Sequence, residues 1–378
     1  MNESLNLSKI DQENALNICK FFIKSGQNLF LFGRRGIGKT HIILQAAKEC
    51  GVKVNYINLS VIERPDLAGY PDLSSKDDVV TFKSPYFLPS LKEDQNCDSI
   101  ILFDEIDKAS PEVTAPLLEI LQFKKINGKP INAKACLLTG NLIEEGAHSN
   151  LISTALLDRG AKFLLNFDSD KWFDWALTNN MHELILGFLQ SNPKFICGKI
   201  EDLSYASPSP RSWTYASESL KKAKILKIND SETIHHIISG FVGYEAGFNF
   251  KIWHEYFKKY EAIVHSIIDF GEINFDLSQL NKTELLVFAL TASMYAKQKT
   301  LSNKNNSNKF LFLQNLCKLL NQKIIENEIK LVALSSVFNY DLIVKYELYS
   351  CVEFYNLFDF LSKNIQKNLS KKLNNFKK

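Results

Sequence analysis

Short apolar runs alternate with amphipathic stretches along the first half of the chain. The apolar or alternating runs predict strands at residues 29–32, 54–60, 99–103 and 135–141. Helical periodicity of apolar positions predicts helices at residues 8–25, 39–50 and 111–123. Residues 154–166 form a further amphipathic segment that leads into a last strand. Strands that alternate with helices predict βαβ units and a parallel sheet with helices on its faces.

Two stretches interrupt this alternation. Residues 61–97 contain several prolines and glycines, so we expect an insertion that carries a small hairpin, with residues 79–83 as its strand-like part. The dipeptide Asn127-Gly128 favours a tight turn and predicts a second hairpin.

The rest of the chain has a helical pattern. Residues 170–260 are interrupted only by a proline-rich piece at 206–213, and helix follows helix from about residue 262. We therefore expect an α/β domain at residues 1–168, a helical domain at 169–261 and a helical extension at 262–378. The tail at 362–378 has six lysines and no acid, which is typical of a solvated end, and binding to nucleic acid is the less favoured alternative.

Composition is that of a globular cytosolic protein. A hydrophobic content of 45% is ordinary, and a formal net charge of +3 is too small to argue for nucleic acid by itself. The polar N-terminus lacks an apolar signal core, and the sequence has no run of 18 apolar residues. Seven scattered cysteines without a CxxC pair favour buried thiols in a reducing cytoplasm over a zinc site or a disulfide framework.

The sequence GRRGIGKT at residues 33–40 lies between a predicted strand and a predicted helix. Glycines at this spacing let successive backbone N–H groups surround a polyphosphate, and the following helix adds its positive end. Lys39 would reach the β- and γ-phosphates of ATP, and the Thr40 hydroxyl would bind Mg²⁺. A glycine turn before an ordinary helix is the alternative. The predicted nucleotide-binding residues are Gly33, Arg34, Arg35, Gly36, Ile37, Gly38, Lys39, Thr40, His41 and Asp104.

Polar residues follow two other predicted strands. Asp104 and Glu105 come directly after the run at 99–103, at the carboxyl end where open α/β sheets bind ligands. Asp104 would hold Mg²⁺ through water, and Glu105 would polarise the water that attacks the γ-phosphate. An acidic helix start is the alternative, since Ser110 and Pro111 supply capping chemistry. Asn141 ends the strand at 135–141 and could bond the attacking water, although TGN is also ordinary turn chemistry.

Arginine is scarce, with only five among the 45 basic residues. Because lysine is so much more frequent in this chain, each arginine is a candidate for a position that needs a planar, permanently charged guanidinium group. Arg159 suits phosphate oxygens, and Arg211 follows a proline near a predicted helix start, where a γ-phosphate contact competes with a structural salt bridge. Chance retention is equally favoured for Arg34, Arg35 and Arg64.

In their order along the chain, these residues resemble the motifs of AAA+ ATPases. The phrases PDLAGYP, ILFDEIDKASPEV, TGN, ALLDRG, WFDWAL and SPRSW are similar to the MoxR-like branch, and the resemblance covers about residues 8–260. It implies a P-loop NTPase α/β domain and a helical lid in a ring, commonly a hexamer, with ATP at the subunit interfaces. By this resemblance, residues 33–40 correspond to Walker A, and Asp104 and Glu105 correspond to Walker B. Asn141 corresponds to sensor 1, Arg159 to the arginine finger and Arg211 to sensor 2.

The resemblance also implies that the insertion and the second hairpin face the pore of the ring. Tyr70 and Phe87 are then candidates for aromatics that grip a substrate, with burial as the favoured alternative. Two departures stand out. Arg34 and Arg35 occupy loop positions where many members have prolines, and Gly160 stands where an aromatic often follows the finger.

Three functions are compatible with these features. The first is an ATPase motor that remodels a partner protein, since MoxR-like members often act with a von Willebrand factor A type protein. The second is a nucleic-acid-acting AAA+ module of the loader or translocase type. The third is a nucleotide-gated scaffold that scarcely hydrolyses ATP, and the presence of Glu105 argues against it.

Overall fold

Two compact units make up the chain, the first up to Trp172 and the second from Phe173 onward. The computed structural model describes residues 7–74, 80–89, 98–141, 152–198, 206–302, 310–335, 337–338 and 340–361. The lysine-rich tail therefore lies outside the described residues.

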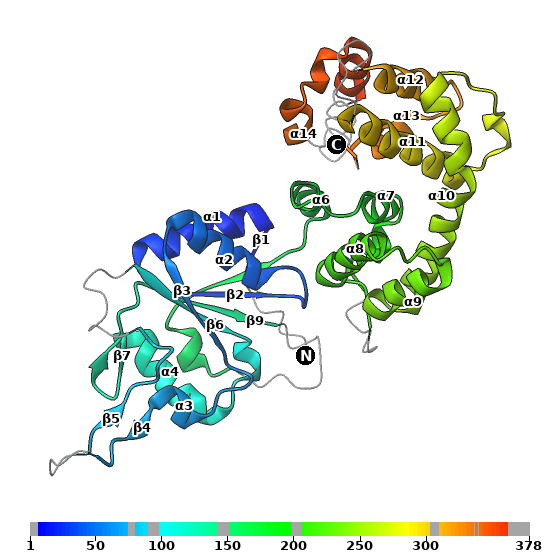
Figure 1. Cartoon of the computed structure of the whole chain (residues 1–378). Coiled ribbons are helices and arrows are strands. Elements are labelled where there is room, and N and C mark those ends of the chain that lie inside the picture. Colours follow the sequence, from blue (N-terminus) through cyan, green and yellow to red (C-terminus); the bar gives the residue numbers. More distant parts are fainter. Residues whose placement is uncertain are drawn as a thin grey trace, which may run out of the picture. The chain divides into compact units, whose positions relative to one another are not determined.

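A six-stranded sheet forms the centre of the first unit (Figure 1). Its strand order is β1-β10-β2-β9-β6-β3, and all neighbouring strands pair in parallel. The strands are β1 (Ser8–Ile10), β10 (Ala161–Leu165), β2 (Leu29–Gly33), β9 (Cys136–Gly140), β6 (Ser99–Asp104) and β3 (Lys53–Asn58). The predicted parallel sheet is confirmed.

Helices cover both faces of this sheet (Figure 1). Leu29 and Leu31 of β2 are buried with side chains of α1 (Gln12–Ser25) and α2 (Lys39–Cys50). Phe30 and Phe32 point to the opposite face and are buried with side chains of α4 (Pro111–Phe123). Since side chains alternate between the faces of a strand, a fully apolar run such as 29–32 needs helices on both sides.

The N-terminal helix begins later than its periodicity predicts. Ser8–Ile10 form the edge strand β1, which pairs with β10. Asp11 has an extended backbone, and its carboxylate accepts the N–H of Asn14 at 2.9 Å. Because an N-cap residue ends the helix on its upstream side, the three residues before it are available for the sheet.

The insertion and the second hairpin lie beside each other. The insertion contains α3 (Arg64–Ala68), which the proline-rich sequence did not predict, and the antiparallel pair β4 (Tyr70–Pro71) and β5 (Phe82–Lys83). The predicted turn at Asn127-Gly128 joins β7 (Lys125–Ile126) to β8 (Lys129–Pro130). Asn127 donates to the Ala68 carbonyl and Lys129 to the Phe82 carbonyl, so side chains of one hairpin bind the backbone of the other element.

The described part of the second unit is helical, as predicted. The helix α6 (Ser169–Thr178) crosses the division between the units. The helices that follow are α7 (Glu183–Ser191), α8 (Pro210–Ile225), α9 (Ser231–Val242), α10 (Tyr244–Phe270), α11 (Lys282–Ser302), α12 (Leu311–Leu320), α13 (Asn327–Ser335) and α14 (Tyr340–Lys345). Since α10 runs through residues 261 and 262 without a break, a domain boundary there stays a prediction.

Aromatic rings form much of the core between α7, α8 and α10. The ring centroid of Phe188 lies 5.5–6.1 Å from those of Phe195, Trp213, Phe250 and Trp253. Large rings in contact contribute both buried area and favourable edge-to-face geometry. His254 of α10 stacks on Phe250 at 6.0 Å and is only 7% exposed. Burial, with the nearby Lys258 and His182, lowers the pKa of His254 from 6.5 to about 4.

We expect acid to destabilise the second unit through His254. Between pH 6.5 and about 4 the unfolded chain binds a proton that the folded His254 does not, so the free energy of unfolding falls as the pH falls. The full loss is about 3 kcal/mol at most. Urea unfolding followed by tryptophan fluorescence should show a shallower pH slope for His254→Phe than for the wild type. Equal slopes would assign the pH dependence to other groups.

Candidate nucleotide-binding site

Three strand ends meet at one edge of the central sheet. Because β2, β9 and β6 are adjacent and parallel, their carboxyl ends share an edge. The glycine loop begins after Gly33 at the end of β2, Asn141 follows β9, and Asp104 is the last residue of β6. The structure therefore brings together groups that are far apart in the sequence.

The loop between β2 and α2 has the backbone of a phosphate cradle. Gly36 and Gly38 have φ angles of 72° and 99°, which side chains with a Cβ rarely adopt. Gly38 is the N-cap of α2 and provides no capping side chain, so the helix start is open to a ligand that accepts hydrogen bonds. The side chain of Ile37 is buried in the core between the sheet and α1 and α2, so it fixes the loop.

Lys39 is held inside this loop. Its ammonium donates to the carbonyls of Gly33 at 2.7 Å and Arg34 at 2.8 Å, and to Oδ1 of Asn141 at 2.9 Å. The residue is 8% exposed. A phosphate oxygen would replace neutral acceptors with a charged one, which strengthens a hydrogen bond of this kind. The donor set and the glycine backbone fit a bound polyphosphate.

Asp107 orients Asn141. Its carboxylate is 1% exposed and accepts the backbone N–H of Asn141 at 2.8 Å and the side-chain Nδ2 at 3.2 Å. With Nδ2 turned to this carboxylate, Oδ1 of Asn141 faces Lys39. Sequence reasoning missed Asp107, because an aspartate in an acidic stretch near a helix start gives no sign of a tertiary partner.

Three hydroxyl groups surround the carboxylate of Asp104. Thr40 donates at 3.1 Å and Tyr56 at 2.9 Å, and Thr139 donates as well. Hydroxyl and carboxylate oxygens are hard ligands that suit Mg²⁺. The described residues contain no cluster of three metal-ligating side chains, so Mg²⁺ bound at Thr40 and Asp104 would take its other ligands from phosphate and water. Tyr56 and Thr139 were not predicted from the sequence.

Glu105 has an uncommon backbone conformation. Its φ of 60° and ψ of 47° are left-handed, and its N–H donates to the Thr139 hydroxyl at 3.3 Å. Non-glycine residues in this region cost about 1 kcal/mol or more and are concentrated at functional sites. The side chain is about one third exposed and lies 3.4 Å from the Lys108 ammonium. Glu105 is thus turned out of the strand that ends in Asp104.

Arg159 lies at the other edge of the sheet. It precedes β10, whose first residue pairs with Leu29 at the amino end of β2. Asn28 holds the Arg159 backbone by donating to its carbonyl at 2.9 Å. A Cβ on Gly160 would lie 2.8 Å from the Asn28 carbonyl oxygen, which explains why no aromatic follows Arg159. The length of the five-residue strand β2, roughly 16 Å, separates this edge from the glycine loop.

The remaining predicted site residues are Arg34, Arg35, His41 and Arg211. Arg35 and His41 are exposed and Arg34 is half-buried, and their predicted contacts with a nucleotide stay predictions. Arg211 is exposed in the first turn of α8, after Pro210 and the N-cap Ser209, as its sequence context predicts. It belongs to the second unit, so its role as sensor 2 stays a prediction.

The geometry agrees with the family comparison. Residues 29–144 match the family described as ATPase family associated with various cellular activities (AAA). The first unit therefore contains an AAA ATPase-family domain, and the predicted fold class, a P-loop NTPase α/β domain followed by a helical part, is confirmed. This match does not distinguish the MoxR-like branch from other AAA ATPases.

The chain also shows a limited likeness to solved structures. A putative ATPase from Cytophaga hutchinsonii is 16% identical, with 88% of this chain and 85% of that chain covered and a TM-score of 0.34. The RuvB Holliday junction branch migration motor of Thermotoga maritima is 15% identical, with 73% and 84% covered and a TM-score of 0.36. No curated protein matches the sequence of this chain.

We expect Asp107 and Asn141 to be energetically coupled. Asp107→Ala removes the acceptor of two N–H donors and should lower the free energy of unfolding by about 1–3 kcal/mol. Asn141→Ala removes only the side-chain bonds and leaves the backbone N–H on Asp107. In a double-mutant cycle measured by urea unfolding, the interaction energy should be on the order of 1 kcal/mol. Additive effects would show that the amide and the carboxylate do not depend on each other.

Proposed function

We propose that the chain is a Mg²⁺-dependent ATPase of the MoxR-like branch that works as a ring and remodels a partner protein. The separation of Arg159 from the glycine loop carries this proposal. Both groups suit a triphosphate, yet they lie at opposite edges of one sheet. Two subunits that meet head to tail would bring the arginine edge of one to the loop edge of the next.

Within one subunit, binding and hydrolysis are divided among the residues of the loop edge. The N–H groups of the loop and the Lys39 ammonium bind the phosphates. Glu105 polarises the attacking water, and Asn141, oriented by Asp107, bonds that water or the γ-phosphate. Thr40 and Asp104 would hold Mg²⁺, which would supply positive charge against the negative charge that develops on the phosphates.

Arg159 completes the site of the neighbouring subunit in this proposal. One terminal nitrogen of its guanidinium group donates to Gln122 at 3.0 Å and the other to the Ala155 carbonyl, whereas its buried Nε has no hydrogen-bond partner within the described part of the chain. An arginine finger supplied by another chain raises the rate of phosphoryl transfer by roughly 10³–10⁵ in other systems. Contacts of this head-to-tail kind form a closed ring when the rotation between neighbouring subunits closes, and the resemblance to MoxR-like proteins implies a hexamer.

The surface of the insertion supports a protein partner rather than nucleic acid. Tyr70 is 60% exposed, Leu73 is 95% exposed and Val80 is 69% exposed, all on or next to the β4–β5 hairpin. Apolar side chains gathered on one exposed element mark protein contacts more often than phosphate contacts. Phe87 packs against the core of the first unit, so Tyr70 is the better candidate for gripping a substrate.

The class of the partner follows from the resemblance, and the place of action follows from the scattered cysteines of this chain. We propose a von Willebrand factor A type protein as the partner and the cytosol as the place of action. None of the helices in the described residues is long and apolar enough to cross a membrane.

We expect Glu105→Gln to bind ATP and to lose turnover. A neutral amide cannot polarise the attacking water, so kcat should fall by about 10²-fold or more while nucleotide affinity is retained. With ATP bound but uncleaved, the variant should accumulate as a ring in sedimentation experiments. Glu112→Gln is the matched control, because it removes the same charge from an exposed position in the first turn of α4. Wild-type turnover in the Glu105 variant would remove Glu105 from this role.

We also expect two inactive variants to restore activity when mixed. Lys39→Ala damages the loop edge and Arg159→Ala the arginine edge, so a mixed interface can carry one intact copy of each. With random mixing, roughly a quarter of the interfaces are intact, and turnover should rise toward that share of the wild-type value.

Lys39→Ala mixed with Glu105→Gln provides the control for this rescue. Both changes damage the same edge, so no mixed interface is intact and the mixture should stay inactive. If subunits exchange in the ring and the Lys39 and Arg159 variants still give no activity at any ratio, the two groups do not share a site.

A further inference from the structure

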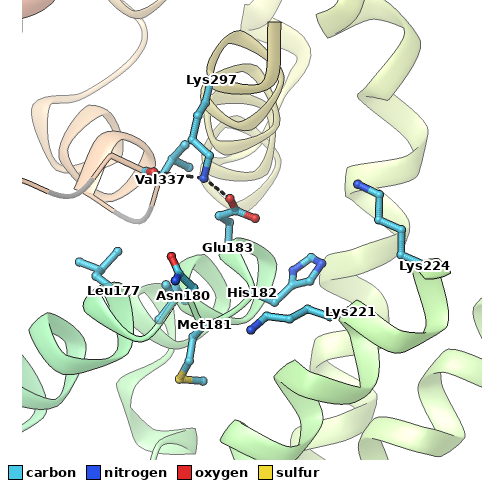
Figure 2. A pocket seen from close by; sticks show the side chains of 10 residues that line it. Leu177, Asn180, Met181, His182, Glu183, Lys221, Lys224, Lys297 and Val337 are labelled. Carbon is cyan, nitrogen blue, oxygen red and sulfur yellow. Dashed lines mark hydrogen bonds and ion pairs between the residues drawn. The ribbon is translucent and has the colours of Figure 1, made fainter. Parts of the chain in front are cut away.

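A pocket of about 300 Å³ lies within the second unit, where the turn between α6 and α7 faces α8 and α11. Figure 2 shows the side chains that line it, with Glu183 of α7 paired to Lys297 of α11. The residues that line it are Leu177, Asn180, Met181, His182, Glu183, Leu186, Lys221, Lys224, Lys297 and Val337. None of them belongs to the site of the first unit.

The lining is positively charged. It contains three lysines and a single carboxylate, Glu183, which is already paired with the ammonium of Lys297. Lys221 pairs with Glu218 at 2.7 Å, outside the lining, but exposed pairs three residues apart on a helix contribute little. Lys221 and Lys224 therefore leave the pocket with an excess of positive charge.

His182 adds a directed donor between these lysines. Its Nδ1 accepts the N–H of Leu184 at 3.3 Å, so a neutral ring carries its proton on Nε2. Its backbone N–H donates to the Ser217 hydroxyl of α8 at 2.8 Å, which fixes the residue between α7 and α8. In Figure 2 the ring points toward the space between Lys221 and Lys224.

The electrostatic environment of His182 agrees with a cationic pocket. Burial lowers its pKa, and Lys224, Lys221 and Lys297 lower it further, whereas Glu183 opposes them. His254 of α10 is also close enough to interact with it. An anion bound among these groups would offset the lysines and raise the pKa of His182.

Four of the lining residues are apolar, namely Leu177, Met181, Leu186 and Val337. A volume of about 300 Å³ is at the small end for ligand sites, enough for one phosphorylated group and a compact organic part but not for a polymer strand.

We propose that this pocket binds a small phosphorylated molecule, with its phosphate on His182, Lys221 and Lys224 and its organic part against Leu177 and Met181. Lysine ammonium groups and an imidazole N–H are suitable donors to phosphate oxygens. The pocket does not include the glycine loop, so this proposal does not depend on whether the chain hydrolyses ATP.

The test uses the full chain with Lys39→Ala, so that the glycine loop no longer holds phosphates, and inorganic pyrophosphate as the probe. Calorimetry should show one site. Adding Lys221→Gln and Lys224→Gln should weaken the affinity by about tenfold or more, since each charge-assisted hydrogen bond contributes substantially. Lys222→Gln with Lys227→Gln is the matched control. These two substitutions remove the same amount of charge near the C-terminal end of α8, but both lysines are exposed and neither lines the pocket.

A second measurement follows His182 directly. In NMR titrations of the same protein, pyrophosphate should raise the pKa of the His182 ring, and His182→Gln should identify its signal. Three results would each overturn the proposal: no pyrophosphate binding, an equal loss of affinity in the control pair, or pyrophosphate binding with no change at His182. Preferential binding of single-stranded DNA that depends on Lys221 and Lys224 would also overturn it, in favour of a nucleic-acid surface.

Discussion

The parallel pairing of β2, β9 and β6 is the constraint on which the candidate site depends. Three central strands that run in one direction must end at one edge, so the loop after Gly33, Asn141 and Asp104 become neighbours. The helices on both faces keep water from the apolar runs that form these strands. Packing thus fixes the strand ends, and only the polar residues at those ends remain available for chemistry.

Polar groups at this edge bind one another through shared atoms. The Thr139 hydroxyl donates to Asp104 and accepts the N–H of Glu105, so one side chain of β9 orders both the last residue of β6 and the residue that follows it. Asn141 similarly bonds Lys39 through its oxygen and Asp107 through its nitrogen. A ligand at Lys39 therefore exchanges existing hydrogen bonds instead of filling unsatisfied ones, and the buried groups stay paired without it.

Sequence reasoning could predict the parts of this arrangement that have a local signature. The spacing of Gly36, Gly38 and Lys39 and the apolar run before Asp104 show on the sequence itself, as does the Asn127-Gly128 turn. Asp107, Tyr56 and Thr139 could not be predicted, because their roles depend on pairing between strands that are distant along the chain. The edge strand β1 was missed for a similar reason: its partner β10 lies about 150 residues away.

Helix α8 joins two features of the second unit. Arg211 stands in its first turn, and Lys221 lies ten residues later, roughly 15 Å along the helix. Between them, Trp213 is buried and donates to the Phe195 carbonyl at 2.7 Å, and Ser217 accepts the N–H of His182. Two hydrogen bonds therefore join α8 to the N-cap of α7 and to the short 3-10 turn Pro193–Phe195 that follows α7. An anion that binds Lys221 and His182 together would therefore strengthen the α7–α8 contact, and the orientation of Arg211 relative to α7 would become more strictly fixed.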